Sequence, residues 1–305
     1  MLSRVNGATE QYLTDLDRIQ SNLDQVQRQI SSGVRVGIGS DDPGAVPSIL
    51  SIQSQIAANN QLQSNLNDLK SELDSGDSAL QQAVTLVEQA ISLGAQTQNP
   101  LTDTARNDLL QQVQGILSQL VDISGTVVDG RYIFSGDLDT KPLYTYDPTQ
   151  PNGVVQLATA QSTRIVTEPG GVMIWHANTA EDIFDARNPD GTPATSNVFA
   201  AVGALATALQ NNDTSTIQAI RDQLTAADDH LNQQLGLYGI AENRVSGAQD
   251  VSSSALINEK QRLSTLRDTD VAGAALELNQ LQLQQEAALS ARAKMQPQSL
   301  FDYLA

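Results

Sequence analysis

The first 30 residues carry an apolar stripe whose members are spaced alternately four and three residues apart. Most of the positions between them are Asp, Gln, Arg or Asn. A mean period of 3.5 residues is typical of a coiled-coil seam, so we expect a long helix that pairs with another helix. An amphipathic helix lying on a globular core is the alternative. The stripe consists of Val5, Thr9, Tyr12, Leu16, Ile19, Leu23, Val26 and Ile30.

Two further helices are expected before residue 125. The second helix spans about residues 44 to 97, with Asp42 as its cap and Pro43 in its first position, where no amide donor is needed. Gly76 stands where a core residue is due, which predicts a kink or a close helix crossing there. Thr102 or Asp103 caps the third helix. The two stripes are Leu62, Leu66, Leu69, Leu73, Leu80, Val84, Val87 and Ile91, and then Leu109, Val113, Ile116, Leu120 and Ile123.

The pattern changes after residue 125 to short apolar runs separated by turn residues. Asp129 and Gly130 stand between two such runs and predict a two-residue hairpin. From 137 to about 193 the chain is rich in Pro, Gly, Asn and Asp, with strand-like runs at 153–158, 163–167 and 172–176. We therefore predict a small β-rich insertion with Trp175 as its core anchor.

Helical patterns return in the last third of the chain. One stripe runs from Val198 to Leu209, and another from Ile217 to Tyr238. A final helix is expected from about Ala241 to residue 295, with a break at 268–272. The fold class is thus mainly α, a coiled-coil-like helical rod built from both ends of the chain, with a β-rich insertion.

The final helix has apolar residues on two opposed faces when its positions are placed 100° apart. The N-terminal helix has one strong stripe and can cover only one of these faces, so the other is expected to contact another subunit. Leu276, Leu283 and Ala287 form one face, and Ala274, Leu278, Leu281 and Ala288 form the other.

The amino-acid composition argues against several classes of function. The chain has 17 basic and 35 acidic residues, a formal charge of −18, which disfavours nucleic-acid and anionic membrane partners. It has no cysteine, which excludes disulfides. No apolar run approaches the roughly 20 residues of a membrane span. The N-terminus lacks the features of a cleavable signal peptide, so we expect a cytosolic protein unless a dedicated machine exports it.

Candidate chemistry is sparse, and we expect neither catalytic residues, nor a cofactor, nor a metal site. The two histidines, His176 and His230, are far apart and lack partner motifs, and no HExxH motif or P-loop is present. Asp41 and Asp42 suggest a helix cap more readily than a cation site. An enzyme is therefore not expected.

Several segments, in the right order, resemble flagellins and flagellar hook-associated proteins. SSGVRV (31–36) and SDDP (40–43) are similar to the segment after their first helix, and GLYGIAENR (236–244) and DTDVA (268–272) to segments of their C-terminal helix. GRYIFSG (130–136) and the ending SLFDYL (299–304) resemble the hook–filament junction members of this group.

The resemblance implies three domains: D0 (1–40 and 263–305), D1 (41–136 and 195–262) and D2 (137–194). It also implies uncleaved export through the flagellar type III apparatus to an extracellular flagellum, and assembly as a homo-oligomeric ring. The implied partners are a FlgK-like junction protein, flagellin, and a FlgN-like export chaperone on the C-terminal helix. The expected assembly residues are Tyr12, Leu16, Ile19, Leu23, Val26, Ile30, Leu276, Leu278, Leu281, Leu283, Leu300, Phe301 and Tyr303.

Three alternatives remain at this point. A short flagellin would form the filament itself and should polymerise alone. An extracellular binding module would use the insertion as a receptor for glycans or surfaces. A type III needle-tip or translocator protein is disfavoured by the ordered motifs and by the lack of an apolar membrane segment.

Overall fold

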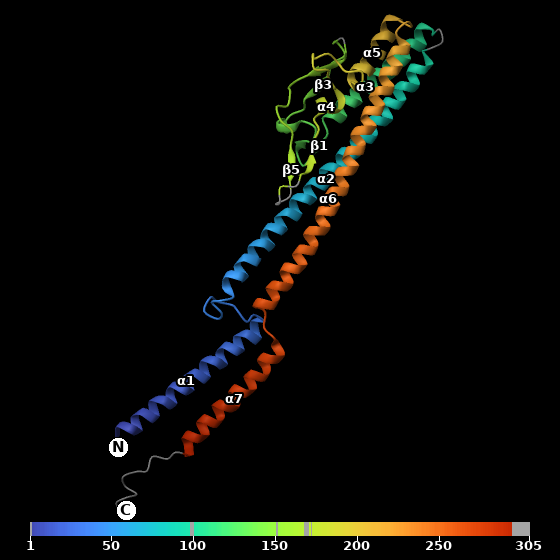
Figure 1. The fold of residues 1–305 in the computed structure, drawn as a ribbon. Helices are drawn as coiled ribbons and strands as arrows, with labels where there is room; N and C mark the ends of the chain where they lie inside the picture. Colours follow the sequence, from blue (N-terminus) through green and yellow to red (C-terminus); the bar gives the residue numbers. More distant parts are fainter. Residues whose placement is uncertain (1, 98–100, 151, 168–170, 172, 295–305) are drawn as a thin grey trace, which may run out of the picture. The chain divides into compact units, whose positions relative to one another are not determined.

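The computed structural model describes residues 2–97, 101–150, 152–167, 171 and 173–294, and most of them are helical (Figure 1). This confirms the predicted fold class. The helices are α1 (Leu2–Ser32), α2 (Val46–Gln96), α3 (Asp103–Ser124), α4 (Ala180–Phe184), α5 (Val198–Asn211), α6 (Ile217–Arg267) and α7 (Val271–Lys294). The short elements are β1 (Val127–Val128), β2 (Arg131–Tyr132), η1 (Gly136–Leu138), β3 (Tyr144–Tyr146), β4 (Val154–Gln156), β5 (Ile165–Thr167) and β6 (Met173–His176).

The chain divides into two compact units. The terminal unit contains residues 1–60 and 254–305, and the central unit contains residues 61–253. The expected D0–D1 boundaries at residues 40 and 263 fall inside the terminal unit. The expected D2 segment, 137–194, lies wholly inside the central unit.

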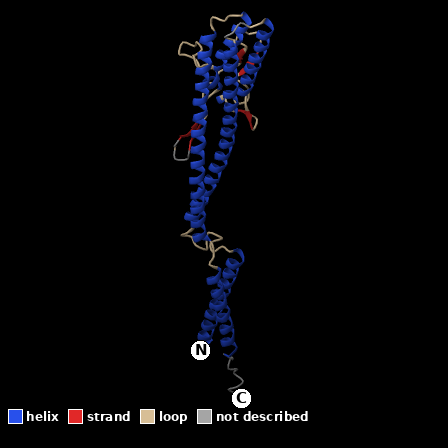
Figure 2. Cartoon of the chain, turned by 90° about the vertical axis from the view of Figure 1, so that its right-hand side faces the viewer, coloured by secondary structure: helices blue, strands red, loops and turns tan. Residues whose placement is uncertain are grey.

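In the central unit α2 and α6 run antiparallel, side by side (Figures 1 and 2). Gln63 Nε2 donates to Ser253 Oγ, and Gln249 Nε2 donates to Asn67 Oδ1, each at 2.9 Å, so numbers rise along one helix as they fall along the other. Between these helices and α3 and α5 lies one continuous hydrophobic core. Its α2 members include Leu66, Leu69, Leu73, Leu80, Ala83, Val87 and Ala90.

Gly76 marks a close crossing of α2 and α6, as its position in the stripe predicts. A Cβ atom built on Gly76 would collide with the Tyr238 ring. Tyr238 is buried, and its ring centroid lies 4.9 Å from that of Trp175. The absence of a side chain at position 76 therefore lets an aromatic ring of α6 reach the core.

The expected helix boundary between Tyr238 and Ala241 is wrong, because α6 continues without interruption to Arg267. Gly236 and Gly239 weaken helix propensity, but tertiary packing overrides it. The buried stripe passes through this region unbroken, with Leu231, Tyr238, Ala241, Val245 and Ala248 all in the core. The expected break at 268–272 is confirmed, since α6 ends at Arg267 and α7 begins at Val271.

The start of α2 also differs from its prediction. Asp42 Oδ1 accepts a hydrogen bond from the Ala45 amide at 3.1 Å, but this closes a turn, and the helix begins only at Val46. Pro47, rather than Pro43, lies in its first turn. The cap of α3 is confirmed as Thr102, whose side chain accepts from the Ala105 amide at 3.2 Å.

The strands of the described residues form three separate antiparallel pairs, β1–β2, β3–β4 and β5–β6, and no larger sheet. The predicted hairpin is confirmed: Asp129 and Gly130 have φ values of 51° and 78°, as a type I′ turn requires. β3 and α4 were not predicted, because three and five residues are too short to show a period.

Within the described residues, the buried core of the insertion is continuous with that of the helices. Trp175 is buried as expected, but it packs on Tyr238 of α6. Phe184 of α4 stacks on Phe199 of α5, with ring centroids 5.6 Å apart. Strands, short helix and long helices thus share a single hydrophobic cluster, and the insertion is anchored to the helices by aromatic contacts.

Candidate assembly interface

The terminal unit is built on the antiparallel pair α1 and α7. Gln285 Nε2 donates to Gln20 Oε1 at 3.0 Å, and the Arg292 guanidinium lies 5.5 Å from the centre of the Tyr12 ring. The hydrophobic cluster between these helices contains Leu23, Val26, Ala274 and Leu281, with Ile19, Ile30 and Leu278 packed against it. The α1 stripe therefore packs on one face of α7.

The opposite face of α7 is open. Leu276 and Leu283 are 72% and 67% exposed, and Ala287 is also exposed. The residues of the other face are buried (Ala274, Leu281) or half-buried (Leu278, Ala288). This burial agrees with the predicted two-faced helix, while the role of Leu276 and Leu283 in contacting other subunits stays a prediction.

The remaining predicted assembly residues divide into two groups. Tyr12 and Leu16 are half-buried on α1. Leu300, Phe301 and Tyr303 lie outside the described residues. Sequence reasoning overlooked Leu13, which is exposed on α1 beside the stripe. Leu13 is apolar but does not occupy a heptad position, so the stripe did not include it.

A second feature of the terminal unit, the Arg35 clamp, holds the segment after α1 to the segment before α7. Arg35 Nη2 donates to the Leu266 carbonyl at 2.7 Å, and Nη1 pairs with Asp42 Oδ2 at 3.1 Å. The backbone joins as well, because Val34 and Asp268 form an isolated β-bridge. Two of the motifs that resemble flagellar proteins, at 31–36 and 268–272, therefore meet in space.

Asp41 and Asp42, the acidic pair at this clamp, both accept hydrogen bonds from within the chain. The Asp41 carboxylate accepts from the amides of Ile38 and Gly37 at 2.9 Å each, and these bonds lower its pKa. The hydrogen bond from the Arg35 side chain is the largest cause of the lowered pKa of Asp42. Both carboxylates stabilise a turn, which agrees with a structural role.

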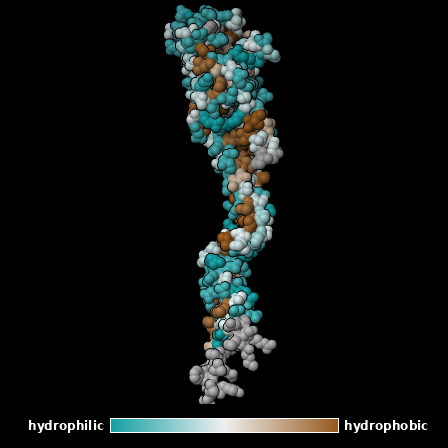
Figure 3. Space-filling view, turned by 90° about the vertical axis from the view of Figure 1, so that its left-hand side faces the viewer, coloured by the Kyte–Doolittle hydropathy of each residue, from teal (hydrophilic) through white to brown (hydrophobic). Residues whose placement is uncertain are grey.

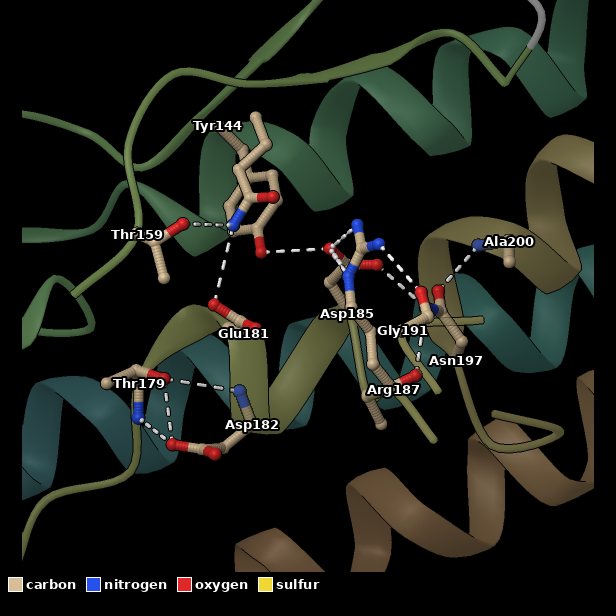
Figure 4. A network of polar contacts seen from close by, with 12 residues as sticks. Tyr144, Thr159, Thr179, Glu181, Asp182, Asp185, Arg187, Gly191, Asn197 and Ala200 are labelled. Carbon is tan, nitrogen blue, oxygen red and sulfur yellow. Dashed lines mark hydrogen bonds and ion pairs between the residues drawn. The ribbon is translucent and has the colours of Figure 1, made fainter. Parts of the chain in front are cut away.

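In the central unit a buried polar network around Asp185 ties the insertion to α5 (Figure 4). Asp185 accepts hydrogen bonds from the Tyr144 hydroxyl at 3.0 Å, from Arg187 Nη2 at 2.7 Å and from Asn197 Nδ2 at 2.7 Å. Asn197 Oδ1 in turn caps α5 by accepting from the Ala200 amide at 2.8 Å. Burial, followed by the Asp185 charge, raises the pKa of Tyr144.

Neither histidine forms a reactive site. The ring nitrogen Nε2 of His176 lies 2.9 Å from Thr163 Oγ1, and Nε2 of His230 donates to the Asp182 carbonyl at 2.9 Å. Among the described residues, no group of three or more His, Asp or Glu side chains is placed to hold a metal ion. Within the same residues no helix is long and apolar enough to cross a membrane.

The face drawn in Figure 3 is largely hydrophilic, with separate hydrophobic areas. In the terminal unit, the exposed large apolar side chains include Leu276 and Leu283 on the open face of α7.

Comparison with known proteins places both ends of the chain in one family. The family model of the bacterial flagellin N-terminal helical region matches residues 4–139, and that of the bacterial flagellin C-terminal helical region matches residues 203–304. Together they cover more than three quarters of the chain. No curated protein sequence matches the chain.

Several solved structures are similar to this chain. FlgL from Bacillus cereus is 18% identical over 70% of this chain and 99% of its own, with a TM-score of 0.55, which shows a shared fold. FlgL from Xanthomonas campestris is 15% identical over 70% of this chain and 99% of its own (TM-score 0.43). The flagellar junction protein FlgL from Legionella pneumophila is also 15% identical, with the same coverage (TM-score 0.44). With matches to both helical regions, the chain belongs to the bacterial flagellin family.

Proposed function

We propose that this protein is a structural junction component that joins the flagellar hook to the filament, assembled as a ring through its terminal helices. The observation that carries the proposal is the open face of α7. Leu276 and Leu283 are exposed on it, while the opposite face is covered by α1. Since flagellin-family proteins are structural, the chain is not an enzyme.

The free energy of assembly would come largely from these exposed leucines. Removing one leucine side chain from water contributes about 1.5–3 kcal/mol. Repeated around a ring of copies, such contacts would hold the terminal helices together. In the free monomer the same residues would promote aggregation, which supports our proposal that a FlgN-like chaperone covers the C-terminal helix before type III export.

Two observations favour a junction protein over a filament subunit. The fold is shared with Bacillus cereus FlgL. The GRYIFSG segment, which resembles junction proteins, begins in the β1–β2 turn and places Ile133 and Phe134 in the core of the central unit. It thereby anchors the insertion. On this proposal the neighbours are a FlgK-like junction protein on the hook side and flagellin on the filament side.

The test is deletion of the gene, followed by electron microscopy of the cells and analysis of the medium. A junction protein predicts hooks without filaments and flagellin released into the medium. Normal filaments in the deletion strain would contradict the proposal. Loss of filaments without released flagellin would replace it with the alternative of a short flagellin, which should also form filaments from purified protein alone.

A further inference from the structure

A cleft of about 440 Å³ opens in the central unit between α2, the β1–β2 hairpin and β5. We propose that it binds an arginine side chain of a partner polypeptide. The residues that carry this inference are Asp68 on α2, Asp129 and Tyr132 on the hairpin, and Val166 on β5. The inference concerns the central unit and does not depend on the role proposed for the α7 face.

The unneutralised charge of the cleft is negative. Its two guanidinium groups are already paired inside the protein: Arg131 with Asp139 at 2.7 Å, and Arg164 with Glu72. Asp68 and Asp129 line the same cleft, and neither carboxylate has a hydrogen-bond or ion-pair partner among the described residues. An incoming cation therefore meets two free carboxylates and no free positive charge.

The other walls select a cation with a flat head and an apolar stem. Tyr132, which is half-buried, lines the cleft, and Leu69, Val166 and Ala177 supply apolar surface. A guanidinium group stacks on an aromatic face and bonds carboxylates in a planar fork, whereas an ammonium group is a compact, strongly hydrated charge. This combination favours arginine over lysine or a metal ion.

The backbone around the cleft suits a polypeptide partner. The volume falls in the range of about 300–1,000 Å³ that is typical of ligand sites, and it accommodates a side chain together with its flanking backbone. β5 contributes to the walls and belongs to a two-stranded pair, so it has an edge without a strand partner in the described part of the chain. Such edges can hold an extended segment by main-chain hydrogen bonds.

The test is an NMR titration of the ¹⁵N-labelled full chain, at low salt, with the peptide acetyl-Gly-Gly-Arg-Gly-Gly-amide. The amides of Gly136, which lines the cleft, and of Gly130, between the lining residues Asp129 and Arg131, report binding, and the amide of Gly94, near the other end of α2, serves as the remote reference. Two further peptides replace arginine with lysine or with uncharged citrulline. The lysine peptide keeps the charge and changes the shape of the head group, and the citrulline peptide keeps the shape and removes the charge.

We expect saturable shifts at the cleft for the arginine peptide, weaker binding of the lysine peptide and none of the citrulline peptide. Asp68→Asn and Asp129→Asn should each weaken binding about two- to fivefold, as expected for one partly exposed charge pair. Asn at position 129 preserves the turn, because Asn-Gly suits a type I′ hairpin. Tyr132→Leu should abolish the preference for arginine over lysine.

Asp122→Asn, which removes an exposed carboxylate of α3 outside the cleft, is the matched control and should leave binding unchanged. Equal weakening by Asp122→Asn would mean general attraction to the acidic chain and would overturn the proposal. The absence of saturable shifts at the cleft would also overturn it. If spermidine bound there as tightly as the arginine peptide, the proposal of a peptide partner would be wrong, and the cleft would be a site for a small cation.

Discussion

Both antiparallel helix pairs of this protein carry periodic apolar stripes, but they bury their apolar residues to different extents. In the central unit, Leu73 and Leu80 of α2 are completely buried. In the terminal unit, the α1–α7 contact buries one face of α7 and leaves Leu276 and Leu283 exposed. Leu73 and Leu80 find apolar neighbours within one chain, whereas we propose that a second molecule covers Leu276 and Leu283.

The difference arises from the number of elements around each pair. α3, α5 and the insertion pack against α2 and α6, so that core positions meet neighbours on several sides. The cluster between α1 and α7 contains residues from those two helices alone. A helix with two apolar faces and one partner necessarily exposes the second face.

The largest expected effect comes from comparing two leucines of opposite environment. Leu80→Ala should lower the free energy of unfolding of the central unit by about 2–5 kcal/mol, because it leaves a cavity in a packed core. Leu276→Ala should change the stability of the monomer by no more than about 0.5 kcal/mol. Denaturant titrations monitored by Trp175 fluorescence for the first variant and by circular dichroism for the second measure these changes. A similar loss for both leucines would contradict the comparison.

The next effect concerns alkaline pH and the buried Tyr238. Burial raises the pKa of Tyr238 far above its ordinary value of 10.0. Above pH 10 the unfolded chain releases the phenolic proton while the folded chain keeps it, so stability should fall by up to about 1.4 kcal/mol per pH unit for this group. Below pH 10 the group is protonated in both states and its contribution to stability is constant.

Unfolding of the Tyr238→Phe variant, followed by selective excitation of Trp175, should show a correspondingly shallower decline above pH 10. Tyr12→Phe, in the terminal unit, is the control and should leave the slope of the Trp175 transition unchanged. An unaltered slope in Tyr238→Phe would mean that this hydroxyl does not resist ionisation in the folded state.

A further effect distinguishes two helical glycines. Gly76→Ala should destabilise the central unit by about 1–3 kcal/mol, because the new methyl group meets the Tyr238 ring. Gly247→Ala, on the open side of α6, should stabilise it by up to about 1 kcal/mol through helix propensity. Thermal denaturation of both variants measures the two changes in stability. Shifts of the same sign would show that the close crossing at Gly76 does not restrict the core.

Sequence periodicity predicted the features that depend on local spacing. The heptad stripes located the long helices, the Asp129-Gly130 pair located the hairpin, and the two-faced pattern anticipated which α7 residues are buried. Each of these follows from the geometry of one segment and needs no knowledge of distant residues.

The errors arose where tertiary contacts decide the outcome. A helix start was expected near Ala241, but α6 runs through this point, with Tyr238 buried just before it. The sequence predicted a β-rich insertion with Trp175 as its core anchor, and no local pattern indicated that Trp175 packs against α6. The Arg35 clamp joins segments more than 200 residues apart, which no local pattern reveals.

The central claim is that the outer face of α7 is reserved for neighbouring subunits, and Leu283→Asp tests it most directly. The gene encoding the variant replaces the chromosomal gene. Gln282→Asp, which changes an exposed position on another side of α7, is the matched control. Electron microscopy and flagellin in the medium are scored together with the unfolding curve of the purified monomer. The account predicts an unchanged monomer, loss of attached filaments in Leu283→Asp and normal filaments in Gln282→Asp. Normal filaments in Leu283→Asp would contradict it.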